Sequence, residues 1–204
     1  MENCVLLLLT PGDIACRVGD PPGGMFGLVR GNLGAIISRA ERSPYVAHFP
    51  RPGTWFGEAC AITGQPRRVG LVAVRETALL HIPLPRVLEL LTAHPEWWRF
   101  LALVTLEHAD TATLAGVDLL QREPQKRIAA VMLRLTGSRV GSLEPGDGPW
   151  QAFVSQEDIA LFSNVTRNTV GAVLKDMTAR GIVKIGYRSL EVLKPGALRA
   201  MLAE

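Results

Sequence analysis

The sequence predicts an α+β protein in which an antiparallel, strand-rich part comes first, one long helix follows, and the remainder is mainly helical. Two observations predict this order. Turn-forming pairs such as Pro-Gly, Gly-Asp and Thr-Gly recur about every 8–12 residues up to Pro85. Beyond Pro85 the turn signals become sparse, and apolar residues recur at helical spacing. The chain has 204 residues and 48% hydrophobic content, which is enough to bury a core.

Short β-rich runs lie between the turn signals of the first part. We expect strands over residues 25–29, 35–38, 45–48, 69–74 and 78–82. Short strands separated at this spacing are typical of an antiparallel sandwich or barrel. The first part is therefore predicted to be all-β.

A short helix over residues 86–93 and a long helix over residues 96–120 come next, with Pro95 suited to the first turn. One stripe of the long helix carries Trp97, Leu101, Val104 and His108. A second stripe, which we predict to be a dimer interface, carries Trp98, Thr105, Ala109, Ala112, Gly116 and Leu119. Two stripes indicate two neighbours, namely the β-rich part and a partner helix. The alternative is a helix buried on two sides within its own chain.

A further helix is expected over residues 125–135, followed by a turn-rich loop over residues 137–150. Helix-turn-helix features come after this loop. Ser155 and Thr166 are good N-caps for helices over residues 156–162 and 167–179, and Asn164 tolerates the sharp turn between them. Residues 182–185 and 190–193 then predict a two-stranded wing.

Positive charge gathers on this last segment. Residues 166–194 contain six basic and two acidic side chains. In a helix-turn-helix the second helix enters the major groove, and basic residues hold phosphates. The predicted DNA-contacting residues are Thr166, Arg167, Asn168, Thr169, Ala172, Lys175 and Arg188. The alternative is a winged helix that contacts only proteins.

Composition argues against several other classes. No apolar run approaches the roughly 20 residues needed to cross a bilayer, and the start of the chain does not read as a secretory signal, so we expect a cytoplasmic protein without membrane contact. Cys4, Cys16 and Cys60 lack metal-ligand spacing, so no metal site is predicted, and we expect small buried residues rather than redox groups. No nucleophile–base pair or second carboxylate supports an enzyme using Glu58 and Arg67.

Four stretches together resemble the CRP/FNR family of bacterial transcription regulators: "GDPPGGMFGLVRGNLGAI", "PGTWFGEACAITGQPRR", the long helix after Pro95, and "SQEDIALFSNVTRNTVGAVLKDM". The resemblance implies a cyclic-nucleotide-binding-like β-roll of the double-stranded jelly-roll type over residues 1–94. It also implies a dimerisation helix and hinge over residues 95–122 and a winged helix-turn-helix over residues 123–204. The expected partners are a second copy of the chain, double-stranded DNA with a two-fold site, and RNA polymerase if the protein is an activator.

The resemblance also gives a role to "FGEACAITGQPRR", which is similar to the phosphate-binding cassette of cyclic-nucleotide domains. There the glutamate after glycine binds a ribose hydroxyl, and the arginine clamps the cyclic phosphate. The candidate effector-binding residues are Gly57, Glu58, Ala59, Arg67, Arg68 and Thr113. Arg68 departs from the family, because a small residue usually follows the clamping arginine.

The effector stays open at this point. The alternatives are a cyclic nucleotide, another small molecule and no effector at all. A different interpretation of the whole chain is a nucleotide-binding regulatory module without DNA function. An iron–sulfur cluster is disfavoured because it needs four ligands, and only Cys4 and Cys16 lie near the N-terminus. Haem is disfavoured because its candidate axial ligands are more typical of core residues than of haem ligands. These candidates are His48, His81, His108 and Cys60. The recognition helix reads "TRNTVGAVL" rather than the family's common "SRETVSRVL", so the usual operator is not inferred.

Overall fold

The computed structural model describes residues 4–39, 42–137 and 150–203. The chain divides into two compact units, Met1–Ala109 and Asp110–Glu204, and each is described by itself. The division falls within the long helix, whose first half belongs to the first unit.

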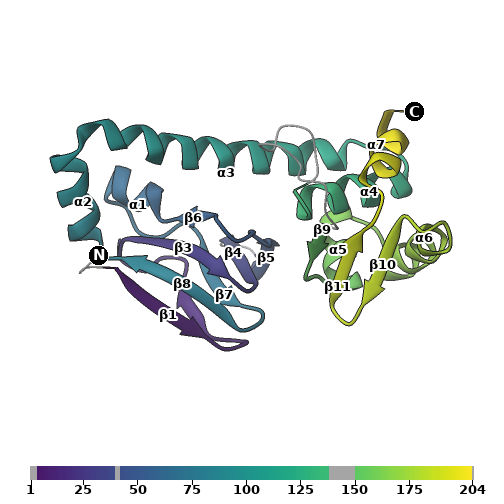
Figure 1. The fold of residues 1–204 in the computed structure, drawn as a ribbon, viewed down its shortest axis with the longest axis horizontal. Helices are drawn as coiled ribbons and strands as arrows, with labels where there is room; N and C mark the ends of the chain where they lie inside the picture. Colours follow the sequence, from purple (N-terminus) through teal and green to yellow (C-terminus); the bar gives the residue numbers. More distant parts are fainter. Residues whose placement is uncertain (1–3, 40–41, 138–149, 204) are drawn as a thin grey trace. The chain divides into compact units, whose positions relative to one another are not determined.

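The first unit is a β-roll (Figure 1). Its described residues form two four-stranded antiparallel sheets with the orders β1-β8-β3-β6 and β2-β7-β4-β5. The strands are β1 (Val5–Leu9), β2 (Ile14–Cys16), β3 (Met25–Arg30), β4 (Leu33–Arg39), β5 (Arg42–His48), β6 (Trp55–Phe56), β7 (Gly70–Ala73) and β8 (Thr77–Ile82). The five expected strands are confirmed, whereas β1, β2 and β6 were not predicted.

Inward-facing residues of both sheets build the core of the roll. Leu28, Leu33, Leu71 and Leu79 are almost completely buried, and Phe26 and Phe56 belong to the same cluster. Burying a leucine contributes about 1.5–3 kcal/mol relative to leaving it exposed. The packed sheets therefore give the first unit a rigid frame.

Three helical segments lie next to one another near one end of this frame, and the long helix begins beside them (Figure 1). They are α1 (Glu58–Thr63), α2 (Leu84–Ala93) and η1 (Pro95–Trp97), and α3 (Trp98–Leu119) follows. Leu101 of α3 packs in a second core with Ala61 of α1 and Val87 of α2. The helix α1 was not predicted, because the sequence suggested only a turn there.

Gly57 explains where α1 begins. Its φ of 97° is left-handed, and a Cβ at this position would collide with the carbonyl oxygen of Gly24. Only glycine accepts both conditions, so the chain can turn sharply and present Glu58 as the first helical residue.

The second unit begins within α3 and is mainly helical (Figure 1). Its elements are α4 (Pro124–Leu135), β9 (Trp150–Ala152), α5 (Gln156–Ser163), α6 (Arg167–Ala179), β10 (Val183–Gly186), β11 (Ser189–Val192) and α7 (Pro195–Ala203). The three described strands pair antiparallel in the order β10-β11-β9. The predicted helices and the wing are confirmed, β9 and α7 were not predicted, and most of the expected loop over 137–150 lies outside the described residues.

The predicted caps of the helix-turn-helix are present. Ser155 Oγ accepts from the Asp158 N–H at 3.1 Å, and Asp158 Oδ2 accepts from the Ser155 N–H at 2.8 Å, which forms a capping box. Thr166 Oγ1 accepts from the Thr169 N–H at 3.2 Å. Asn164 between the helices has a φ of 48°. Among the described residues, none of the helices is both long and apolar enough to traverse a bilayer.

Candidate functional site

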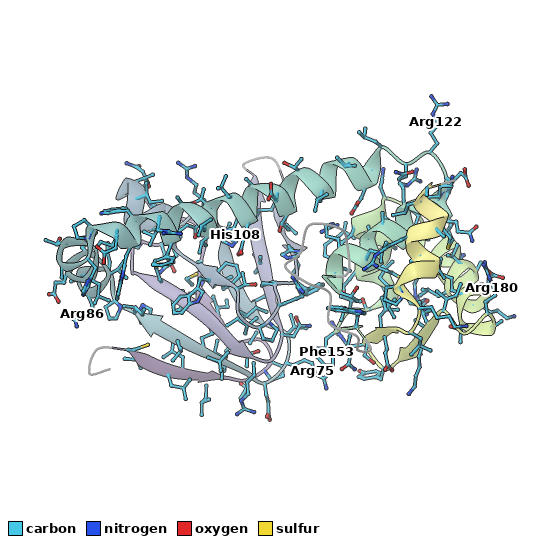
Figure 2. The ribbon with its side chains drawn as sticks, turned by 45° about the horizontal axis from the view of Figure 1, so that its top comes forward. Arg75, Arg86, His108, Arg122, Phe153 and Arg180 are labelled. Atoms are coloured by element: carbon cyan, nitrogen blue, oxygen red, sulfur yellow. The ribbon has the colours of Figure 1, made fainter. Side chains whose placement is uncertain are left out.

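The predicted cassette residues Glu58 and Arg67 are both buried, with 7% and 6% of their surfaces exposed. Glu58 Oε1 lies 3.0 Å from Nδ1 of His108 on α3. The imidazole also stacks on Phe56, with 5.4 Å between the ring centroids. Figure 2 shows His108 on the side of α3 that faces the sheets of the first unit. The cassette glutamate is therefore already bonded within its own chain.

Burial and pairing act in opposite directions on this acid and base. Burial alone would raise the pKa of Glu58. The hydrogen bond and charge of His108, together with the backbone N–H groups of Glu58 and Ala59, outweigh burial and leave that pKa below its ordinary value. The hydrogen bond to Glu58 raises the pKa of His108 above its ordinary value, against the effect of burial. Both shifts favour a carboxylate paired with an imidazolium.

Arg67 is also held within the chain. Its Nη2 donates to the Gly24 carbonyl at 2.9 Å, and its guanidinium carbon lies 4.8 Å from the centre of the Phe26 ring. A Cβ on Gly23 would lie 3.2 Å from Nη2, and one on Gly57 would lie 3.1 Å from Nη1. The three glycines thus let the backbone close around a cation that also stacks on an aromatic ring.

The predicted effector residues are only partly brought together. Gly57, Glu58 and half-buried Ala59 are consecutive at the start of α1, and Gly57 adjoins Arg67. Arg68 is exposed beside buried Arg67, and Thr113 is exposed on the part of α3 that belongs to the second unit.

Sequence reasoning missed His108 as the partner of Glu58. It did place His108 on the stripe of the long helix that faces the β-rich part, and that stripe contacts the roll through buried Leu101. His81, on β8, is hydrogen-bonded from Nε2 to the Gly23 carbonyl at 2.9 Å and stacks on Phe26 at 4.6 Å. His81 therefore packs on Phe26, the ring against which the Arg67 guanidinium lies.

The predicted dimer residues Trp98, Thr105, Ala109, Ala112, Gly116 and Leu119 are all exposed in the single chain. Further large apolar residues are exposed on or just beyond α3, including Leu103, Leu106, Val117 and Leu120. These four, with exposed Asp110 and Thr113, repeat at alternating steps of three and four residues. That spacing is the a/d repeat of a coiled coil. We name these six residues the α3 seam; the sequence reasoning had selected a stripe rotated away from it.

The predicted DNA-contacting residues lie on one end of α6 and on the wing. Thr166, Arg167, Asn168, Ala172, Lys175 and Arg188 are exposed, and Thr169 is half-buried. Val170, Leu174 and Met177 are buried on the opposite face of α6. The helix is thus held by its apolar face and presents its polar face outward.

A cleft of about 300 Å³ lies between the start of α5, the start of α6 and the wing. Its lining includes Glu157, Arg167, Tyr187 and Arg188. Arg167 Nε is 2.7 Å from Glu157 Oε1. Tyr187, at the wing tip, is 93% exposed, and Arg188 has a left-handed φ of 47°. Tyr187 and Glu157 were not among the predicted site residues.

Two arginines of α4 bind the end of α3 and the residues that follow it, all within the second unit. Arg134 Nε donates to Asp118 Oδ2 at 2.8 Å, with both side chains buried, and burial lowers the pKa of Arg134 to about 10. Arg127 donates from Nη1 to the carbonyls of Gln121 (2.9 Å) and Arg122 (3.2 Å), and from Nε to the Ser163 carbonyl (3.0 Å). Sequence periodicity gave no sign of either link.

The two units match two family models. The cyclic nucleotide-binding domain matches residues 6–94, and the Crp-like helix-turn-helix domain matches residues 126–201. The cyclic AMP receptor protein of Thermus thermophilus is 29% identical over 148 residues, which are 72% of this chain. The match spans 64% of that relative's length, just under two thirds.

Solved structures share the fold. FixK2 from Bradyrhizobium japonicum superposes with a TM-score of 0.77 at 16% identity, covering 97% of this chain and 96% of that chain. A CRP-family transcriptional regulator from Thermus thermophilus superposes with a TM-score of 0.70 at 19% identity, covering 97% of each chain.

A cyclic-nucleotide-binding-type roll followed by a Crp-like helix-turn-helix defines a two-part regulator. The chain belongs to the CRP/FNR family of transcription regulators, which is not a family of enzymes.

Proposed function

We propose that this protein is a homodimeric transcription regulator that binds a two-fold site in double-stranded DNA through α6 and the wing. The observation that carries the proposal is the exposed polar face of α6, whose first turn presents Arg167 and Asn168 while Val170 and Leu174 anchor the opposite face. Arginine can bind guanine O6 and N7 with two hydrogen bonds, and asparagine can bind adenine in the same way.

Charge on the same unit supports a nucleic acid as the partner. Lys175, Lys184 and Arg188 are exposed on α6 and the wing, where they suit phosphate contacts. Exposed Tyr187 at the wing tip adds an aromatic ring beside Arg188. DNA binding places the protein in the cytoplasm, and RNA polymerase is a further partner if the regulator activates transcription.

Dimerisation through the α3 seam would supply the two-fold symmetry of the DNA site. The seam carries Leu103 and Leu106 at one end and Val117 and Leu120 at the other, with Asp110 and Thr113 between them. Leu106 and Leu120 are 58% and 78% exposed in the single chain, so pairing with a second copy would bury them.

Replacing Arg167 with alanine is expected to weaken binding to the specific site by about 1–3 kcal/mol, the cost of one lost bidentate base contact. Duplexes selected by the wild-type protein from a randomised library provide that site, and binding is measured by fluorescence anisotropy. Wild-type affinity should also fall steeply with salt, as counterion release requires.

Arg180→Ala is the matched control, because Arg180 lies just beyond the opposite end of α6 and is labelled in Figure 2. Equal losses for Arg167→Ala and Arg180→Ala would contradict the placement of the α6 N-terminus on bases. A DNA affinity that does not change with salt concentration would favour a regulatory module without DNA function.

We propose further that the roll responds to a small effector, with a cyclic nucleotide as the first candidate, and that the effector must displace bonds within the chain. Glu58 and Arg67 suit a sugar hydroxyl and a phosphate, respectively. In the free chain Glu58 is bonded to His108, and Arg67 is bonded to Gly24 and stacked on Phe26. Such competition would weaken cyclic-nucleotide binding relative to an open site.

Calorimetric titration with cyclic AMP and cyclic GMP at pH 8 tests this arrangement. His108→Ala is expected to tighten binding because Glu58 becomes free to accept from the ribose hydroxyl, and Arg67→Gln is expected to abolish binding. Arg68→Ala, which alters the exposed neighbour, should leave the affinity unchanged. Binding that survives Arg67→Gln would remove Arg67 from the phosphate role. Absence of heat in every variant would favour another effector or a regulator that needs none.

A further inference from the structure

An acidic side chain lies within the otherwise basic face described above. Glu157 is the second residue of α5, and Arg167 is the first residue of α6. Glu157 Oε1 is 2.7 Å from Arg167 Nε, and the two side chains are 63% and 67% exposed. Both residues line the cleft next to the wing. The pair therefore joins the starts of the two helices on the surface that would face DNA.

This ion pair contributes little to folding. Exposed pairs between an arginine and a carboxylate are typically worth about 0.2–1 kcal/mol, because water screens them and two long side chains lose freedom. A carboxylate on a DNA-facing surface also repels phosphates. A role in stability does not account for its position.

The geometry has a clear effect on Arg167. The closest approach of the Glu157 carboxylate to the guanidinium is at Nε rather than at Nη1 or Nη2. A guanidinium has five N–H donors, so this approach leaves the terminal fork of Nη1 and Nη2 for another partner. That fork matches O6 and N7 of guanine. A long side chain held by a neighbour also loses less conformational freedom on binding.

We infer that Glu157 is a positioning residue that sets sequence specificity by holding Arg167 for end-on recognition of guanine and by opposing non-specific phosphate contacts. This inference rests on the proposed DNA-binding function. It assigns the discrimination at one base pair to two residues from different helices of the motif. Arg167 touches the base, and Glu157 acts through Arg167.

The test compares discrimination with general affinity. Wild type, Glu157→Ala, Glu157→Gln and Arg167→Ala are titrated with three kinds of duplex. They are the selected site, a set of sites in which one half-site guanine at a time is replaced by adenine, and a random sequence. Asp176→Ala is the matched control, because Asp176 on α6 forms an exposed ion pair at 3.3 Å with Arg180, which follows the end of the helix.

Glu157→Ala is expected to reduce the preference for one guanine about fivefold or more while strengthening random-sequence binding about two- to fivefold. Glu157→Gln should strengthen random-sequence binding similarly and keep part of the preference for that guanine, because the glutamine amide oxygen can still lie against Arg167 Nε. Arg167→Ala should lose the preference for this guanine, and Asp176→Ala should keep it.

The inference would be overturned if Glu157→Ala kept the wild-type preference for guanine, or if its affinity changed equally for all three kinds of duplex. Either result would leave the proposed DNA binding intact. Failure of the wild-type protein to bind any duplex in a salt-dependent manner would overturn the proposed function as well. The two failures are therefore distinguishable.

Discussion

Replacing Asp118 with alanine is expected to destabilise the second unit by about 3–5 kcal/mol, because Arg134 would be left charged and unpaired in a buried position. The exposed surface of Asp118 is 0% and that of the Arg134 side chain is 5%, and their hydrogen bond is 2.8 Å long. Water cannot easily replace the lost carboxylate at such a site. The loss would be a large part of the stability of a typical domain.

Urea denaturation of the full chain, followed by circular dichroism, measures this loss. Two transitions are fitted because the chain has two compact units. Asp176→Ala, which breaks an exposed pair, should cost about 0.5 kcal/mol or less. The double variant Asp118→Leu, Arg134→Met should recover most of the stability, since it removes both charges together. A double variant as unstable as Asp118→Ala would show that the cost does not arise from the unpaired cation.

Replacing Leu106 with lysine is expected to convert the proposed dimer to monomers at micromolar concentration. Leu106 forms one apolar end of the α3 seam together with Leu103, and it is 58% exposed in the single chain. The substitution removes two leucines that the proposed dimer would bury, worth about 1.5–3 kcal/mol each if fully buried, and introduces two charges that must be desolvated. We therefore expect the dissociation constant of the dimer to rise about a thousandfold or more.

Sedimentation velocity gives the oligomeric state of this variant. Leu88→Lys is the control, because Leu88 is an exposed leucine (41%) on α2 rather than on the seam. Affinity for the complete two-fold site should fall with dimer loss, whereas affinity for a single half-site should change little. A Leu106→Lys protein that stays dimeric would place the interface elsewhere.

Much of the fold could be predicted from the sequence because its signals are local. Turn residues mark the ends of β3 and β8, and the caps Ser155 and Thr166 mark the starts of α5 and α6. The helix α1 could not be predicted in the same way. Its six residues are too few to display helical periodicity, and its start depends on the carbonyl of Gly24, more than thirty residues earlier.

The candidate effector site was predictable only as a list of residue types. The spacing of Glu58 and Arg67 suggests a clamp, but their partners His108 and Gly24 lie 50 and 43 residues away in the chain. Such pairings depend on how α3 and β3 pack. The stripe predicted from the sequence as the dimer interface differs from the α3 seam that we propose. Apolar residues lie on several sides of this helix, so composition alone does not say which side the roll covers.

The contacts of Arg127 join the residues after α3 to the helix-turn-helix within the second unit. One guanidinium bonds the carbonyls of Gln121 and Arg122, which follow α3, and the carbonyl of Ser163, the last residue of α5. A rotation of the peptide groups after α3 would therefore pull directly on the first helix of the DNA-reading pair. One side chain therefore fixes the residues after α3 to both α4 and the end of α5, and replacing Arg127 would leave all three carbonyls without this donor at once.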